Sequence, residues 1–182
     1  MTAKKVMPAI VVAAIVISLI VFGLSAVGPV GTLIIGGSGV LAFFAWIFTT
    51  FKTPADPGAI LPLYLLLVGT ELIHMSEEAI TDFPGQFGLL FSDSFSFFAP
   101  MVLFFGGVWV IAGFGLIYRN PVANFFVWFV AIGPGIINGI AHVTFPFLAG
   151  TLYFPGLVTV IFPFAASVLL IRRLLQGHRE SA

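Results

Sequence analysis

Four ionisable side chains lie within one short segment of the chain, 71–78, which reads ELIHMSEE. They are Glu71, His74, Glu77 and Glu78, and the stretch around them is apolar enough to cross a bilayer. A charged side chain near the bilayer centre costs roughly 2.5–3.5 kcal/mol, so residues of this kind usually serve a function. Histidine and glutamate together can bind a divalent metal ion or transfer protons. We therefore take this segment as the candidate reactive site.

The spacing of these residues places them on one face of a helix. Because a helix advances about 100° per residue, Glu78, His74 and Glu77 lie at roughly −20°, −60° and −120° from Glu71. The set thus occupies about a third of the helix circumference. A stripe this polar cannot face lipid, so we expect it to face the interior of a helix bundle.

A second polar pair, Asn138 and His142, occurs later in the chain, in the sequence NGIAH. The i, i+4 spacing stacks the two side chains on one helix face. Gly133, Pro134 and Gly135 come just before the pair. Proline removes a helix hydrogen bond, and glycine loosens the backbone, so this sequence predicts a kink or a short unwinding beside the site.

Tyr153 and Thr159 add polar groups near the start of the last apolar run, in the sequence YFPGLVT. His74, His142 and Thr159 each lie about eight residues from the outer end of a predicted helix, which is about 12 Å of helix. Three helices therefore carry polar groups at one depth in the outer half of the bilayer. This agreement predicts a single site built from all three.

The composition is that of a membrane protein. Of 182 residues, 60% are hydrophobic and 8% are charged, whereas a soluble domain carries about 25% charged residues. The length indicates one domain, 1–182. The chain has no cysteine, which excludes disulfides and thiolate ligands. The formal net charge is zero and the basic residues are dispersed, so we expect no nucleic-acid partner.

Apolar runs of about 20 residues predict spanning helices. We expect an all-α, polytopic transmembrane bundle, with the first run retained as a helix rather than removed as a signal peptide. The six predicted spans are 6–27, 30–51, 59–82, 97–118, 121–148 and 152–175.

The basic residues predict the orientation of this bundle. With six spans and a cytoplasmic N-terminus, every Lys and Arg falls on the cytoplasmic side, as expected of cytoplasmic loops, and the C-terminus lies there too. The outer side then carries Asp82 and Asp93. The segment 83–96 becomes the longest loop, and we expect it to lie outside, either as an interfacial loop or as a lid over the site.

Three motifs in order resemble those of a known family. The chain contains HxxEE at 74–78, NxxxH at 138–142 and YxPGxxT at 153–159. Over roughly 60–175 it resembles the bacterial membrane-protein family named for its HXXEE motif; the first predicted helix and much of the second lie outside this region. The resemblance implies an integral membrane enzyme of unassigned reaction, in the bacterial inner membrane.

Two histidines and a carboxylate form a set that binds Zn²⁺ or Fe²⁺. We favour one divalent metal ion held by His74, Glu78 and His142. Glu71 would be a fourth ligand or would contact a ligand, and Glu77 would act as the general base for a metal-bound water. Beside them we expect a catalytic role for Asn138 and substrate contacts from Tyr153 and Thr159. The predicted activity is that of a metal-dependent hydrolase or oxidoreductase.

Other interpretations of the same residues stay open. A metal-free site could use a protonated glutamate and a histidine for acid–base isomerisation or cyclisation of a lipophilic substrate. Intramembrane carboxylates and histidines also occur along the proton paths of transporters. A cluster that only fixes helix packing is the structural alternative. A site about 12 Å below the outer surface favours a membrane lipid or another apolar molecule as the partner.

Overall fold

Prolines and short polar side chains mark where the helices of this chain begin. In the computed structural model, Asp56, Asp82 and Asn120 are N-cap residues whose side chains accept hydrogen bonds from the first turn. A proline follows within two residues of each cap. Proline suits this position because its missing N–H would have no partner within the helix. These residues thus mark helix starts at both ends of the bundle.

The structure describes residues 3–92 and 98–181, with side chains described for 6–92 and 98–180. These residues form helices and connecting turns, without a strand among them. The elements are α1 (Ala3–Ala26), α2 (Pro29–Phe48), α3 (Pro57–Ile80), α4 (Phe83–Phe91), α5 (Phe98–Ile117), α6 (Pro121–Val130), the π-helix η1 (Ala131–Ile137), α7 (Asn138–Ala149) and α8 (Ile161–Ser181).

Five helices in the described part of the chain are long and apolar enough to cross a membrane. They are Val6–Ala26, Pro29–Phe48, Pro57–Ile80, Phe98–Ile117 and the continuous unit Pro121–Ala149. Large apolar side chains are exposed along them, including Leu33, Leu103 and Phe147 at 74–81%. Soluble monomers seldom expose apolar surface on this scale, so the chain is suited to a bilayer.

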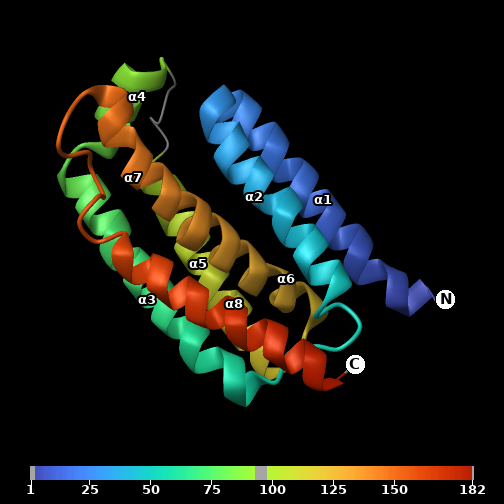
Figure 1. Ribbon diagram of the computed structural model, residues 1–182. Coiled ribbons are helices and arrows are strands. Elements are labelled where there is room, and N and C mark those ends of the chain that lie inside the picture. Colours follow the sequence, from blue (N-terminus) through green and yellow to red (C-terminus); the bar gives the residue numbers. More distant parts are fainter. Residues whose placement is uncertain (1–2, 93–97, 182) are drawn as a thin grey trace.

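The helices form two packed groups (Figure 1). α1 and α2 lie against each other along one side, while α3 packs against both α5 and α8. The unit α6–η1–α7 runs between the groups and contacts both of them. The start of α1 and the end of α8 lie toward one end of the bundle, and α4 lies at the other.

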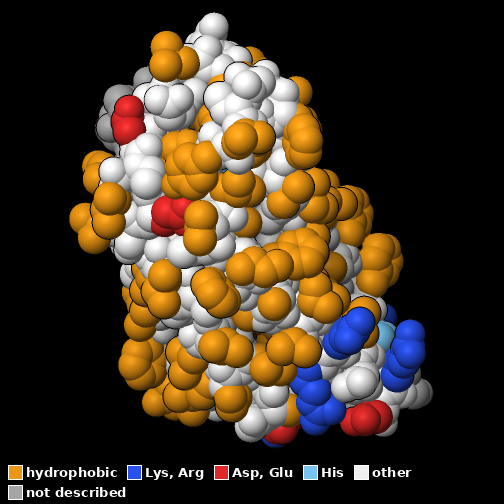
Figure 2. Space-filling view, turned by 60° about the vertical axis from the view of Figure 1, so that its left-hand side comes forward, with side chains coloured by type: hydrophobic (Ala, Val, Ile, Leu, Met, Phe, Trp, Pro, Cys, Tyr) orange, Lys and Arg blue, Asp and Glu red, His pale blue; other side chains and the backbone are white. Residues whose placement is uncertain are grey.

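Basic side chains gather at the end that holds the termini. Figure 2 shows Lys and Arg side chains at this end, acidic side chains toward both ends, and a largely hydrophobic surface between them. Arg119 and Asp56 pair there at 3.5 Å. This distribution agrees with the predicted grouping of the basic residues. Lys4, Lys5 and Asp93, which also entered the topology prediction, lie outside the residues with described side chains.

Two predicted boundaries are wrong. The segment 83–96 is not a loop throughout, because Phe83–Phe91 forms α4 and buries Phe83 and Phe87. The last helix begins at Ile161 rather than at 152, since Thr151–Val160 forms bends and turns. This helix is not among the candidate spans, so the count of six crossings stays a prediction.

The backbone irregularity predicted at Gly133–Pro134–Gly135 takes the form of a π-helix, η1. The helix widens around Pro134 instead of unwinding, and α7 continues directly from it. π-Helical turns frequently occur at functional sites. Here the turn sets the rotation of α7, and therefore the direction in which Asn138 and His142 point.

Candidate functional site

Two histidines and one glutamate meet where α3 faces α7. His74, Glu78 and His142 are 0–4% exposed. Glu78 Oε1 lies 2.9 Å from His142 Nε2 and 3.5 Å from His74 Nε2. One ligand atom from each of the three residues lies within 4.8 Å of the others, which is compact enough to hold a metal ion. Glu71, His74 and Glu78 of the α3 stripe therefore face the bundle interior, as the spacing predicts, whereas Glu77 is only half-buried.

Hydrogen bonds fix the tautomer of His74. Thr159 Oγ1 donates to Glu77 Oε2 at 2.6 Å and lies 3.2 Å from His74 Nδ1. Because the threonine proton is directed to the carboxylate, its oxygen accepts the proton of His74 Nδ1. The lone pair of His74 is then on Nε2, 3.0 Å from Asn138 Nδ2. This nitrogen points toward the cluster and accepts a hydrogen bond from the Asn138 amide, so it could act as a base or a metal ligand once that N–H is displaced.

The Glu77 carboxylate has a different environment from the one predicted for a general base. It accepts hydrogen bonds from the Tyr153 hydroxyl at 2.8 Å and from the backbone N–H groups of Val158 and Thr159 at 3.3 and 2.8 Å, besides the Thr159 hydroxyl. Partial burial and contact with the Glu77 carboxylate raise the pKa of the Tyr153 phenol, so the hydroxyl stays a donor. Glu77 thus ties the 153–159 turn to α3.

Gly156 brings this turn against both histidines. Its φ is +88°, in the region that favours glycine. A Cβ at this position would lie 2.5 Å from His142 Cε1 and 2.7 Å from His74 Cε1. The absence of a side chain therefore lets the backbone cover the edges of the two rings, which lie 4.7 Å apart between centroids in an edge-to-face arrangement.

Phenylalanines close the end of the site nearest α4. Phe83 of α4 lies 5.3 Å from His142 and 6.0 Å from Phe154 between ring centroids. Phe145, one turn after His142, is 5.5 Å from that imidazole. Phe83, Phe87, Phe145 and Phe154 are all at most 5% exposed. α4 thus covers the site, while its predicted action as a lid stays a prediction.

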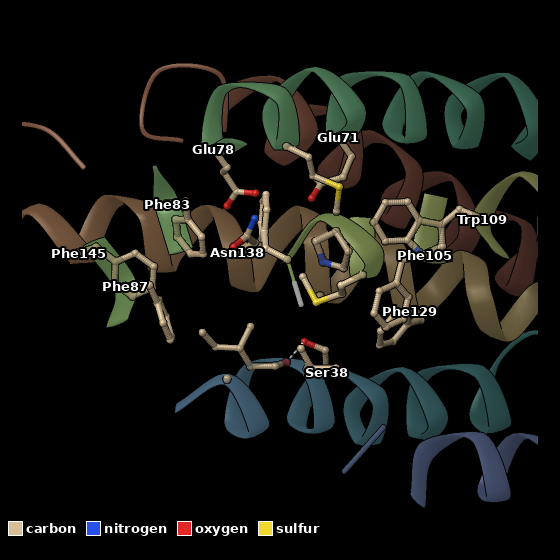
Figure 3. A pocket seen from close by; sticks show the side chains of 18 residues that line it. Ser38, Glu71, Glu78, Phe83, Phe87, Phe105, Trp109, Phe129, Asn138 and Phe145 are labelled. Carbon is tan, nitrogen blue, oxygen red and sulfur yellow. Dashed lines mark hydrogen bonds between the residues drawn. The ribbon is translucent and has the colours of Figure 1, made fainter. Parts of the chain in front are cut away.

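An apolar cavity of about 100 Å³ lies on the inner side of the cluster (Figure 3). Glu71 and Glu78 point into it from α3, and Ser38 lies across from them on α2. Asn138 and Trp109 also line this space. Its other walls come mainly from aliphatic and aromatic side chains of α2, α4, α5 and α6. The cavity is therefore lined mainly by apolar side chains and by a few polar groups, as small-molecule binding sites are.

Two buried polar atoms beside this cavity have no hydrogen-bond partner among the described residues. They are Glu71 Oε2 and Trp109 Nε1. Glu71 is 1% exposed and so is Trp109. A buried acceptor and a buried donor left unpaired each cost about 1–3 kcal/mol. Unpaired atoms of this kind on a cavity wall are suited to contact a ligand.

The structure brings most of the predicted site residues into one hydrogen-bonded cluster. His74, Glu78, Asn138 and His142 contact one another, and Glu77, Tyr153 and Thr159 join them through the 153–159 turn. Glu71 lies on the cavity wall with Glu78 and Asn138.

Gly156 and Trp109 also contribute to the site, although no role was predicted for them from the sequence. The PG pair within the YxPGxxT motif is a signal for a special backbone conformation. Nothing in the sequence distinguishes Trp109 from the two other tryptophans of the chain.

Comparison with known proteins gives no relative: no family model matches the chain, and no curated protein or solved structure is similar to it.

Proposed function

We propose that this chain is an integral membrane metalloenzyme whose single divalent ion is held by His74, Glu78 and His142. The observation that supports this proposal is the convergence of three buried ligand atoms within 4.8 Å. Its motif resemblance to the HXXEE family, and with it a place in the bacterial inner membrane, belongs to the same proposal.

The donor set fits a zinc or non-haem iron ion. Two imidazoles and one carboxylate are the protein ligands in catalytic sites of both metals. Ligand atoms around a tetrahedral zinc are about 3.3 Å apart for bonds of about 2.0 Å, close to the 3.5 Å between His74 Nε2 and Glu78 Oε1. Metal-binding histidines usually donate their other N–H to a polar group. His74 does so, since its Nδ1 faces Thr159.

A bound divalent ion would supply a Lewis acid that polarises a carbonyl or activates water. The residues around it have separable tasks. Asn138 reaches both His74 and the cavity, so its amide can orient a polar group of the substrate. Glu71 presents an unpaired carboxyl oxygen to the cavity and can accept or hold a proton there. We assign Glu77 to positioning His74 through Thr159, in place of the general-base role predicted from its sequence position.

The cavity walls favour an apolar substrate. Its lining is mainly Phe, Trp, Met and Ile side chains. The helices around it are suited to a bilayer, so an apolar molecule could reach the site without crossing water. We therefore propose a lipid or another lipophilic compound as substrate, with hydrolysis or oxidation as the reaction class.

Metal analysis of the detergent-purified protein tests the proposal. After loading with Zn²⁺ or Fe²⁺ and removal of excess metal, we expect about one ion per chain, bound with an affinity typical of histidine–carboxylate sites. His74→Ala and His142→Ala should each abolish stoichiometric binding. His178→Ala is the matched control, because His178 lies near the end of α8 and outside the cluster. Wild-type protein that stays folded but binds neither metal would refute the proposal.

A metal-free acid–base enzyme is the second candidate. The observation in its favour is the 2.9 Å contact between His142 Nε2 and Glu78 Oε1, a normal hydrogen-bond length that needs no ion. In this case Glu71 would donate a proton to the substrate and His74 Nε2 would accept one, as an isomerase or cyclase requires. Activity that survives exhaustive chelation, and is lost in Glu71→Gln, would favour this second candidate.

A further inference from the structure

A wide apolar groove separates α1 from α5. It encloses about 700 Å³ between the two helices, which lack the close packing that joins α1 to α2 or α3 to α5. Its lining is apolar except for Ser18. The residues of α1 are Val11, Ala14, Ile15, Ser18, Leu19 and Phe22, and those of α5 and α6 are Pro100, Met101, Phe104, Phe105, Val108 and Phe126.

The groove and the inner cavity share a wall. Met101 and Phe105 of α5 line both spaces. On the groove side, Phe104 is 65% exposed. On the cavity side, Phe105 stacks on Trp109 with ring centroids 6.1 Å apart. These two side chains are therefore part of the wall between the groove and the cavity that holds the unpaired atoms Glu71 Oε2 and Trp109 Nε1.

We propose that the groove binds one apolar chain of a single-chain membrane lipid, whose polar end passes Met101 and Phe105 to reach Glu71 and Trp109. The proposal rests on the proposed function for what then happens to that polar end. Unpaired polar atoms in the inner cavity indicate a ligand, and the groove is the apolar space next to it. Within a bilayer, its contents would be hydrocarbon chains.

The volumes and polar atoms define the lipid. The groove, at about 700 Å³, is far larger than the inner cavity, at about 100 Å³, so the groove suits a long apolar chain and the cavity suits a small polar end. A phosphoglyceride headgroup is far larger than this. Glu71 Oε2 and Trp109 Nε1 both lack a hydrogen-bond partner among the described residues, and a hydroxyl group, which donates and accepts, can pair with either atom. A second carboxylate would be disfavoured beside Glu71 and Glu78. A long-chain alcohol satisfies these conditions better than a fatty acid or a phospholipid.

Photolabelling tests this assignment. The probe is hexadecanol with a diazirine near its hydroxyl end, added to purified protein in nanodiscs and mapped by peptide mass spectrometry. We expect labels on Glu71, Met101 or Trp109, and competition by unlabelled hexadecanol but not by added phosphatidylcholine. In the wild-type protein, labels confined to side chains outside both spaces, such as Ile17 and Leu103, or absence of competition, would overturn the proposal.

Filling the groove gives a second measurement. Ala14→Phe with Ser18→Phe adds bulk at two exposed groove positions one turn apart on α1. We expect labelling of the cavity residues to fall about tenfold, which corresponds to about 1.4 kcal/mol. Ile17→Phe, on the same helix but outside the groove lining, is the matched control and should leave labelling unchanged. Equal labelling in the filled and control variants would overturn the route through the groove.

The same samples separate this proposal from the proposed function. Metal content is measured on each, and the groove variants should keep the wild-type value because α1 lies outside the cluster. If the protein binds metal but is labelled only on its exterior, the proposed lipid site is refuted. If it is labelled in the cavity but never binds metal, only the proposed metal site is refuted.

Discussion

Glu77 and Glu71 are six residues apart on α3, and their surroundings differ sharply. The Glu77 carboxylate receives four hydrogen bonds from the 153–159 turn. Glu71 is 1% exposed, and its Oε2 has no partner among the residues that the structure describes. One carboxylate is fully engaged by its own chain, whereas the other offers an unpaired oxygen to an apolar cavity.

The two glutamates differ in how the protein uses a carboxylate that is unfavourable to place in a membrane. A carboxylate with several donors is stabilised as an anion and holds its partners in place. A buried oxygen without a donor lowers the stability of the folded state, and proteins commonly tolerate lower stability at functional sites. The comparison therefore assigns architecture to Glu77 and chemistry to Glu71. Three substitutions test whether that division is correct.

Gly156→Ala should have the largest effect, because the turn that engages Glu77 depends on this glycine. The new Cβ would meet both imidazoles, and the backbone is at φ +88°. We expect a loss of about 3 kcal/mol in unfolding free energy from strain and overpacking. Thermal unfolding in detergent, followed by tryptophan fluorescence, measures it.

Gly150→Ala is the matched control for this variant. Gly150 has φ +66°, but a Cβ there would meet nothing within 4 Å. The unfolding free energy of this variant should therefore fall only by the cost of placing alanine at a positive φ, about 1 kcal/mol. Equal losses at the two positions would show that the 153–159 turn does not press on the histidines.

Glu77→Gln should have a smaller effect. The amide keeps the size of the side chain but loses its charge, so hydrogen bonds from the turn weaken by about 1–2 kcal/mol in total. If Glu77 orients His74 through Thr159, metal affinity should also fall about tenfold. A double-mutant cycle of Glu77→Ala with Tyr153→Phe checks the contact itself, because alanine leaves no acceptor for the tyrosine hydroxyl. Strict additivity of the two substitutions would contradict an interaction between Glu77 and Tyr153.

Periodicity in the sequence was enough to find the site. The positions of Glu71, His74 and Glu78 on one helical face follow from 3.6 residues per turn, and the structure places all three on the interior of the bundle. Likewise, the i, i+4 spacing of Asn138 and His142 puts both against His74 and Glu78. These features depend only on helix geometry.

Roles within the site could not be predicted in the same way. A helix face fixes where a Cα lies, but the side-chain rotamer and its donors decide what Glu77 does. Those donors come from a turn 76–82 residues away, in a segment predicted to be helical. α4 was missed because Phe83–Phe91 is short and contains proline and glycine, which indicate a loop. In the folded chain, Phe83 at the start of α4 packs against Phe145 and Phe154, contacts that local sequence does not reveal.

Glu71→Met is the sharpest test of the comparison, although its effect on stability should be the smallest. Methionine has a similar size and no polar atom, so it removes the unpaired oxygen while still filling the wall. We expect the unfolding free energy to stay within about 1 kcal/mol of wild type, or to rise, because a buried unpaired acceptor is lost. Metal content should be unchanged, while labelling of the cavity by the hexadecanol probe should fall. Glu71→Met that unfolds as readily as Gly156→Ala would mean that Glu71 holds the bundle together, as Glu77 does, and the distinction between the two carboxylates would no longer stand.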